Sequence, residues 1–210
     1  MFLGASYFRA VGRDNVWGLA ARGLAIDTVE PTGEEFPNFV EYWLEKPAPD
    51  ATHFVLYALL DGPTATGAYR FDITPGEQTS MAIEAVLFAR GTRPAKIGVA
   101  PLTSMFFFGE NTTRKFDDFR PEVHDSDGLL LHFDGGEWLW RPLENPSRIN
   151  VASFAMKNPR GYGLIQRDRN FDHHQDIETR AERRPSAWIE PRGDWGDGHV
   201  RGVDVFRVRD

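Results

Sequence analysis

Titratable side chains crowd one short stretch of this chain, FRPEVHDSDGLLLHF at residues 119–133. Glu122, His124, Asp125 and Asp127 fall within six positions, directly before a leucine run that is expected to be buried. In an extended segment Asp125 and Asp127 would share one face and His124 would take the other. Two carboxylates at that spacing interact, so one of them can hold a proton near neutral pH. The pattern therefore suggests a general base with an orienting partner.

The same residues have a purely structural interpretation. Asp side chains commonly accept hydrogen bonds from nearby backbone N–H groups where a strand begins, and Pro121 and Gly128 bracket a shaped turn here. This capping role is the commoner use of such residues, and both interpretations stay open. A calcium loop is not supported, because position twelve counted from Asp125 is Gly136 instead of a glutamate. No metal site is expected.

A further acidic candidate is Asp168, which lies between Arg167 and Arg169. Flanking guanidinium groups are expected to lower the pKa of Asp168 and keep it ionised. Asp168 would then serve as a catalytic or sugar-binding carboxylate, with the arginines as donors to sugar hydroxyls. A solvated ion pair that contributes little to stability is an equally good interpretation.

Two other groups suggest binding chemistry less directly. His173 and His174 are adjacent, so their side chains point apart and one ion cannot easily use both; a surface helix cap is the favoured interpretation. Trp138 and Trp140 lie two apart on an expected strand and share a face, where pyranose rings can stack. For at least one of the two tryptophans, a place in the core is the commoner outcome.

The elements that must position these residues are mostly short strands. Aromatic and β-branched segments separated by Gly and Pro predict strands at 39–45, 53–60, 67–73, 80–89, 102–108, 128–133, 137–143, 149–154, 162–166 and 187–190. His132–Trp140 predicts a hairpin with Asp134-Gly135-Gly136 as its turn. Asp172–Glu182 is the one expected helix, short and on the surface. Regular short strands predict an all-β protein, a large antiparallel sandwich with no internal domain boundary.

Composition excludes several classes of function. The 210 residues carry a net charge of −7, so nucleic acid and anionic membrane surfaces are poor partners. There is no cysteine, hence no disulfide, thiolate zinc site or cysteine nucleophile. No apolar run approaches the roughly 18–20 residues that span a bilayer, so no membrane insertion is expected. Nucleotide-binding and serine-hydrolase motifs are missing, and no cofactor is expected.

The two ends are expected to be cut from a larger sheet system. No signal peptide precedes the first strand-like segment. Residues 198–210 alternate like a strand and then stop, which would leave an unpaired edge.

Several stretches together resemble a known family, the periplasmic glucan biosynthesis proteins G and D (OpgG/MdoG-like). They are Phe2–Phe8 (FLGASYF), Ala21–Asp27 (ARGLAID), Ala100–Asn111 (APLTSMFFFGEN), Phe119–Gly128 (FRPEVHDSDG), Gly136–Leu143 (GEWLWRPL) and Pro185–Gly196 (PSAWIEPRGDWG). The likeness runs from Phe2 to about Val200. Residues 201–210 do not look like the family's continuation, for which a shifted reading frame is one explanation.

The resemblance implies an exported protein acting on osmoregulated periplasmic glucans with a β-1,2-linked backbone. The family's first domain is a β-sandwich similar to galactose mutarotase, and an immunoglobulin-like domain follows it. This chain would be a partial sandwich without that second domain. Members are assigned inverting β-1,2-glucanase activity, which needs an acid and a base about 6.5–9.5 Å apart.

Carried onto this sequence, the resemblance makes Asp125 the candidate general base, with Asp127 and Glu122 as supporting carboxylates. The family's general acid is expected beyond the end of this chain, which leaves Asp168 as the substitute.

Trp138, Trp140 and Arg167 would bind substrate. The chain alone is expected to be marginally folded and weakly active, and robust turnover of linear β-1,2-glucan would contradict this. A non-catalytic glucan-binding piece and an inactive fragment are the alternatives.

Overall fold

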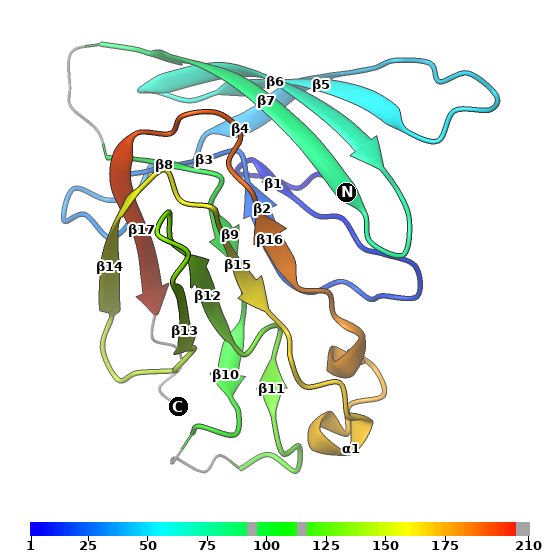
Figure 1. Cartoon of the computed structure of the whole chain (residues 1–210), viewed down its shortest axis with the longest axis vertical. Coiled ribbons are helices and arrows are strands. Elements are labelled where there is room, and N and C mark those ends of the chain that lie inside the picture. Colours follow the sequence, from blue (N-terminus) through cyan, green and yellow to red (C-terminus); the bar gives the residue numbers. More distant parts are fainter. Residues whose placement is uncertain (92–95, 113–116, 205–210) are drawn as a thin grey trace. The chain divides into compact units, whose positions relative to one another are not determined.

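Almost all of the regular secondary structure of the protein is β-strand (Figure 1). A computed structural model describes residues 1–91, 96–112 and 117–204. Its strands are β1 (Tyr7–Phe8), β2 (Ala20–Arg22), β3 (Leu24–Ile26), β4 (Asn38–Leu44), β5 (Phe54–Asp61), β6 (Ala65–Thr74), β7 (Ser80–Ala89), β8 (Ile97–Val99), β9 (Leu102–Thr103), β10 (Phe106–Phe108), β11 (Val123–His124), β12 (Gly128–His132), β13 (Trp138–Pro142), β14 (Asn150–Lys157), β15 (Gly161–Ile165), β16 (Ala187–Ile189) and β17 (Asp197–Asp204). The helical elements are α1 (Phe171–His174) and a 3₁₀ turn, η1 (Ala181–Arg183).

The prediction of an all-β antiparallel fold is confirmed. Every strand pair among the described residues is antiparallel, and β7 has the predicted bounds. The single strand predicted over 102–108 is wrong, because β9 pairs with β2 whereas β10 pairs with β11. The strand predicted over residues 198–210 is present as β17, and residues 205–210 of that prediction lie outside the described part of the chain.

The predicted helix over Asp172–Glu182 is also wrong. Helix α1 ends at His174, its C-cap Gln175 has a left-handed φ of 52°, and the chain then turns. Asp176 fixes that turn by accepting the backbone N–H groups of Glu178 and Thr179. Ile177 and Ala181 lie four positions apart within the predicted helix, yet Ile177 is 81% exposed whereas Ala181 is buried. Side-chain hydrogen bonds to the backbone thus end the helix that the periodicity favoured.

One compact unit comprises residues 1–15 and 20–103. Its main sheet has the order β4-β5-β6-β7, and Figure 1 shows β5, β6 and β7 side by side. Alternate residues of β6, including Tyr69, Phe71 and Ile73, are buried against Phe8 and Leu24 in one hydrophobic cluster. The period-two alternation of β6 therefore defines the inner face of this sheet.

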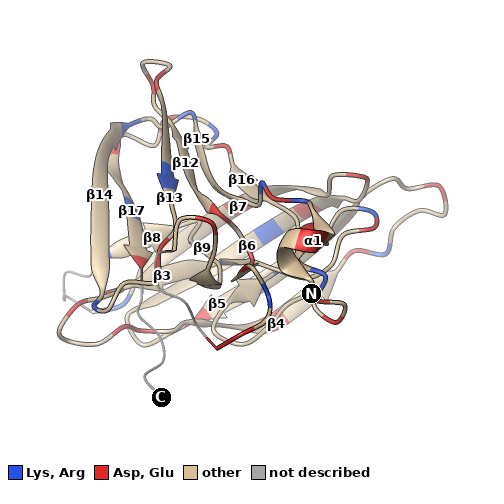
Figure 2. Ribbon diagram, turned by 90° about the horizontal axis from the view of Figure 1, so that it is seen from below, with Lys and Arg blue, Asp and Glu red and all other residues tan. Residues whose placement is uncertain are grey.

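A second compact unit comprises residues 16–19 and 104–210, and no linker in the sequence marks it off. It contains a four-stranded sheet, β13-β12-β15-β16, and a two-stranded sheet, β14-β17. Leu129 and Leu131 of β12 pack with Met156 of β14 in a shared core. Arg141 of β13 forms an ion pair with Asp204 of β17, and Figure 2 shows a basic (blue) segment on β13. The β13-β12-β15-β16 and β14-β17 sheets are thus joined by an apolar cluster and an ion pair.

Candidate functional site

The acidic segment turns sharply between β11 and β12. The Asp125 N–H donates to the Met105 carbonyl over 2.7 Å, and the Asp127 N–H donates to the Ile165 carbonyl over 2.9 Å. These bonds attach the segment to two different neighbours. The expectation that Asp125 and Asp127 share a face opposite His124 is wrong, because Asp127 turns toward His124, with 3.6 Å between Oδ1 and Nε2.

Asp125 is engaged by a cation distant in the sequence. Its carboxylate forms an ion pair with the guanidinium of Arg184 and accepts the Met105 N–H over 3.3 Å. The two side chains are only 14% and 11% exposed. Arg184 also donates to the His124 carbonyl over 3.1 Å. Asp125 therefore sits in a largely desolvated ion pair, and its role as a general base stays a prediction.

Asp127 links the acidic segment at residues 119–133 to the second acidic candidate, Asp168. Its Oδ2 accepts the backbone N–H groups of Arg167 and Asp168, the latter over 3.3 Å. The capping interpretation predicts hydrogen bonds of this kind, but here the donors come from the loop after β15 instead of the local turn. Asp127 thereby holds Asp168 close to the Glu122–His124 pair.

Glu122 and His124 form a buried, hydrogen-bonded pair. His124 Nε2 lies 2.7 Å from Glu122 Oε2, and His124 Nδ1 lies 3.1 Å from Gln166 Oε1. The Gln166 amide nitrogen donates to the Ala181 carbonyl, so its Oε1 can only accept and His124 Nδ1 must carry hydrogen. Contact between Nε2 and the carboxylate then needs a second proton, held by His124 or Glu122. Gln166 gives no signal in the sequence, because it ends an ordinary strand pattern.

Asp168 is lowered in pKa as predicted, but the predicted cause is wrong. Burial alone would raise the pKa of Asp168; hydrogen bonds from the Asn170 N–H and the His173 ring outweigh burial and lower it. The arginines point elsewhere. Arg167 lies over the Trp140 ring, and Arg169 donates to the carbonyls of Glu182 and Arg184.

The two adjacent histidines have opposite environments. His173 is exposed, and its Nδ1 lies 2.6 Å from Asp168 Oδ2, a hydrogen bond that raises the pKa of His173. His174 is fully buried, with its ring 5.2 Å from that of His124. Neither ring nitrogen of His174 has a hydrogen-bond partner in the described part of the chain. The surface-cap interpretation is therefore wrong for His174, because α1 turns that side chain inward.

A small cavity of about 60 Å³ adjoins the buried pair. Its lining residues are Met105, Arg120, Glu122, Val123, His124, Asp176, Thr179, Ala181 and Arg184. Sites for small organic ligands typically enclose about 300–1,000 Å³, so this space suits water and not a sugar ring. Asp125 does not line it. The cavity therefore offers no place for a glucose unit beside the predicted base.

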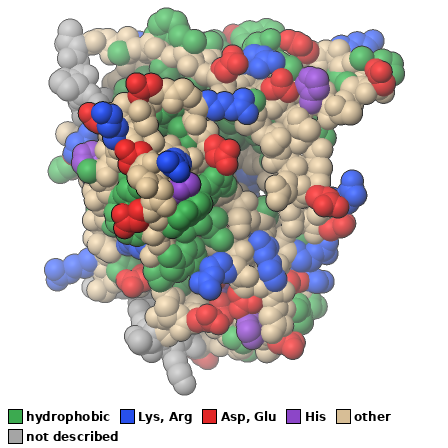
Figure 3. All heavy atoms as spheres, viewed as in Figure 1, with side chains coloured by type: hydrophobic (Ala, Val, Ile, Leu, Met, Phe, Trp, Pro, Cys, Tyr) green, Lys and Arg blue, Asp and Glu red, His purple; other side chains and the backbone are tan. Residues whose placement is uncertain are grey.

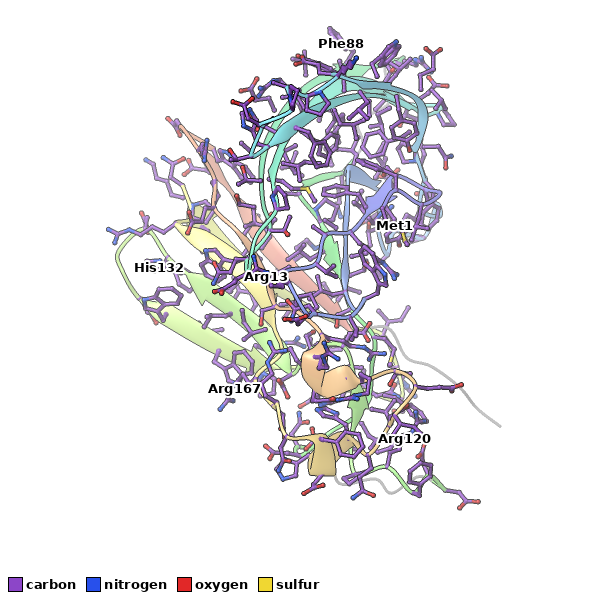
Figure 4. The ribbon with its side chains drawn as sticks, turned by 90° about the vertical axis from the view of Figure 1, so that its right-hand side faces the viewer. Met1, Arg13, Phe88, Arg120, His132 and Arg167 are labelled. Carbon is purple, nitrogen blue, oxygen red and sulfur yellow. The ribbon has the colours of Figure 1, made fainter. Side chains whose placement is uncertain are left out.

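Arg120, labelled in Figure 4, joins two carboxylates next to the cavity. It binds Asp118 over 2.7 Å and Asp176 over 2.6 Å. The pKa of Asp176 is lowered to about 2, first by the Thr179 N–H, with help from Arg120 and against the effect of burial. A carboxyl with a depressed pKa stabilises the fold above its unfolded-state pKa and loses that effect as the pH falls.

Replacing Asp176 by asparagine is expected to lower the free energy of unfolding by about 2 kcal/mol at pH 7. The difference should shrink to about half at pH 3, between the folded and unfolded pKa values. Urea unfolding of the 210-residue chain at pH 7, 5 and 3 measures it. Asp50→Asn, at an exposed position, is the control. A loss that does not vary with pH would contradict the electrostatic origin.

Three tryptophans gather on the face of the four-stranded sheet opposite the core. Trp138 pairs with His132 and Trp188 with Gly163, while Trp140 pairs with Leu130. Neither Trp138 nor Trp140 belongs to a buried core cluster, so the core interpretation is wrong for both. Figure 3 shows hydrophobic side chains gathered over β12 and β13. We call Trp138, Trp140 and Trp188 the aromatic face.

The rings of the aromatic face pack closely against neighbouring rings and against glycines. Trp138 is 54% exposed, stacks on His132 with 3.9 Å between ring centroids, and lies 5.6 Å from the Trp188 ring. Glycines leave room for the other indoles, because a Cβ at Gly128 would clash with Trp140 and one at Gly161 with Trp188. In Figure 4, His132 and Arg167 lie near opposite ends of the β12–β13 pair.

Comparison with known proteins gives the family. Residues 1–207 match the sequence model described as "Periplasmic glucan biosynthesis protein, MdoG". The chain belongs to the MdoG family. The match extends past Val200, so the expectation that residues 201–210 leave the family pattern is wrong at least as far as Arg207.

The relatives that this MdoG-family chain matches are named as glucans biosynthesis proteins G or D. It is 54% identical over 204 residues to "Glucans biosynthesis protein G" of Pseudomonas aeruginosa PAO1, covering 97% of this chain and 39% of the relative. It is 56% identical over 204 residues to "Probable glucans biosynthesis protein D" of Shewanella oneidensis, covering 97% and 38%. The chain thus spans about two fifths of the length of these relatives. No helix among the described residues is long or apolar enough to cross a membrane.

Proposed function

We propose that this MdoG-family chain is a glucan-binding part of a periplasmic protein of glucan biosynthesis. The aromatic face carries the proposal: three indole rings lie on one sheet face, glycines leave room for Trp140 and Trp188, and Trp138 is 54% exposed. Pyranose rings present C–H groups that pack on such π-faces. The family match and the names of the relatives point to glucan as the polymer.

Polar groups beside the aromatic face suit a neutral sugar polymer. Arg167 is exposed, with its guanidinium 5.1 Å from the centre of the Trp140 ring, where its N–H groups can donate to sugar hydroxyls. The net charge of −7 does not oppose binding of an uncharged β-1,2-glucan. We take the linear β-1,2-linked glucose backbone as the ligand.

Replacing Trp138 by alanine is expected to weaken binding of linear β-1,2-glucan by about tenfold or more, the loss typical of an aromatic anchor. Trp140→Ala should act in the same direction. Isothermal titration calorimetry of the 210-residue chain measures the affinity. Trp43→Ala is the matched control, because Trp43 is 50% exposed and lies on β4, outside the aromatic face.

Either of two binding results would reject the proposal. If Trp43→Ala weakens binding as much as Trp138→Ala, the glucan does not use the aromatic face. The same conclusion follows if both variants bind as tightly as the unaltered chain while remaining folded by circular dichroism.

An inverting β-1,2-glucan hydrolase is the second candidate. Carboxylates of Glu122, Asp127 and Asp168 gather around His124 and His173, which gives the groups that acid–base catalysis uses. In this proposal Asp125 activates water and another carboxyl protonates the leaving oxygen. The ion pair of Asp125 with Arg184 and its position outside the cavity favour the binding function.

A further inference from the structure

Four side chains from four separate segments converge beside the buried Glu122–His124 pair. They are Glu110, which follows β10, Glu122, Asp168 and His173. Each offers one potential ligand atom, and these four atoms all lie within 4.8 Å of one another. Metal ligands lie about 2.0–2.2 Å from ions of this class, so modest side-chain movement would place all four around one ion.

The cluster holds more negative than positive charge. Three carboxylates face a single imidazole, His173, and like charges this close repel. One oxygen of Glu122 already contacts His124, and one oxygen of Asp168 contacts His173. A bound cation would offset the remaining repulsion between the carboxylates.

His174 gives an independent reason to expect a ligand here. It is fully buried, its ring lies 5.2 Å from the ring of His124, which contacts the Glu122 carboxylate of the cluster, and neither of its ring nitrogens has a hydrogen-bond partner among the described residues. A buried polar group without a partner is destabilising, because it has lost its hydrogen bonds to water and gained none in the fold. The water molecules of a hydrated ion in the cluster are groups to which these nitrogens can hydrogen-bond.

We propose that Glu110, Glu122, Asp168 and His173 bind one divalent transition-metal ion, Mn²⁺ or Zn²⁺. Carboxylate oxygens alone would suit Mg²⁺ or Ca²⁺, whereas an imidazole nitrogen shifts preference toward the first-row transition metals. This departs from the expectation of no metal, which rested on ligands close together in the sequence. The four ligands span residues 110–173 and meet only in the folded chain.

The test is metal titration of the 210-residue chain after EDTA treatment and desalting. The unaltered chain should bind one Mn²⁺, followed by electron paramagnetic resonance of the free ion, and one Zn²⁺, followed by calorimetry. His173→Gln and Glu110→Gln should each weaken affinity by at least about tenfold. Both positions are exposed, so both variants are expected to fold. His53→Gln and Glu178→Gln, exposed and outside the cluster, should bind as the unaltered chain does.

A second measurement does not depend on substitutions. Substoichiometric Mn²⁺ should broaden the backbone amide resonances of residues 110, 122, 168 and 173 before those of residue 135, in the turn that follows the far end of β12. The proposal is overturned if the cluster variants keep full affinity, if broadening is centred elsewhere, or if the chain binds neither ion. Binding of Ca²⁺ or Mg²⁺ as tight as that of Mn²⁺ and Zn²⁺ would overturn the transition-metal assignment.

Discussion

Replacing Asp125 by alanine is expected to destabilise the 210-residue chain by about 3 kcal/mol, as removal of one partner from a buried ion pair typically does. The substitution leaves the Arg184 guanidinium largely buried, with the His124 carbonyl as its remaining acceptor. Urea unfolding followed by tryptophan fluorescence measures the loss. The effect should be large because an uncompensated charge remains in a desolvated site.

A double variant and an exposed control separate this cause from others. Asp125→Ala together with Arg184→Ala should cost less than the sum of the single changes, because the second removes the unpaired charge. Asp50→Ala, at an exposed position, should change stability by no more than about 0.5 kcal/mol. A loss below about 1 kcal/mol for Asp125→Ala would show that the ion pair is not a structural element.

The same residue separates the two functional candidates in a complete relative. If Asp125 is the general base of an inverting hydrolase, asparagine at the matching position should lower the hydrolytic rate by orders of magnitude and leave glucan binding nearly unchanged. If the region only binds glucan, that variant should differ mainly in stability. Hydrolysis by the variant at the unaltered rate would reject the hydrolase assignment of Asp125.

Replacing Gly163 by alanine is expected to destabilise the chain by about 3 kcal/mol and to remove most glucan binding. The added Cβ would clash with the Ala187 carbonyl oxygen and lie 2.8 Å from a ring carbon of Trp188. The clash involves backbone, so it can be relieved only by separating β15 from β16. Trp188 would then leave its place in the aromatic face.

Gly135→Ala is the matched control for Gly163→Ala. Gly135 lies in the β12–β13 hairpin turn, and a Cβ there would meet nothing within 4 Å. Urea unfolding and glucan titration of the two variants give the comparison. Equal stability and equal affinity in both would show that β15 and β16 tolerate the added methyl and that Trp188 does not depend on their spacing.

The pattern of neighbouring residues was sufficient to predict much of the secondary structure. Aromatic and β-branched residues between turn residues predicted β6 and β7 at nearly correct bounds, and Asp134-Gly135-Gly136 predicted the hairpin that joins β12 to β13. Trp138 and Trp140 had to share a face, because side chains on a strand repeat every two residues. Which face they shared was not predictable, since β12 and β13 carry large side chains on both.

The candidate site was only partly predictable for the same reason. Glu122, Asp127 and Asp168 were selected for their residue type, and the structure places them near one another. Gln166 and Arg184 gave no signal, because each belongs to an ordinary local pattern. Trp188 was visible in the PSAWIEP stretch, but its position beside Trp138 depends on the pairing of β15 with β16.

The sequence by itself determined the antiparallel β class, the hairpin and the family, because these depend on neighbouring residues and on matched stretches of chain. Only the tertiary structure decided which partner each charged group has. Asp125 meets Arg184, Asp127 caps the loop after β15, and His174 turns inward. Such contacts join segments some 40–60 residues apart, and their hydrogen-bond geometry is fixed only when the strands pair.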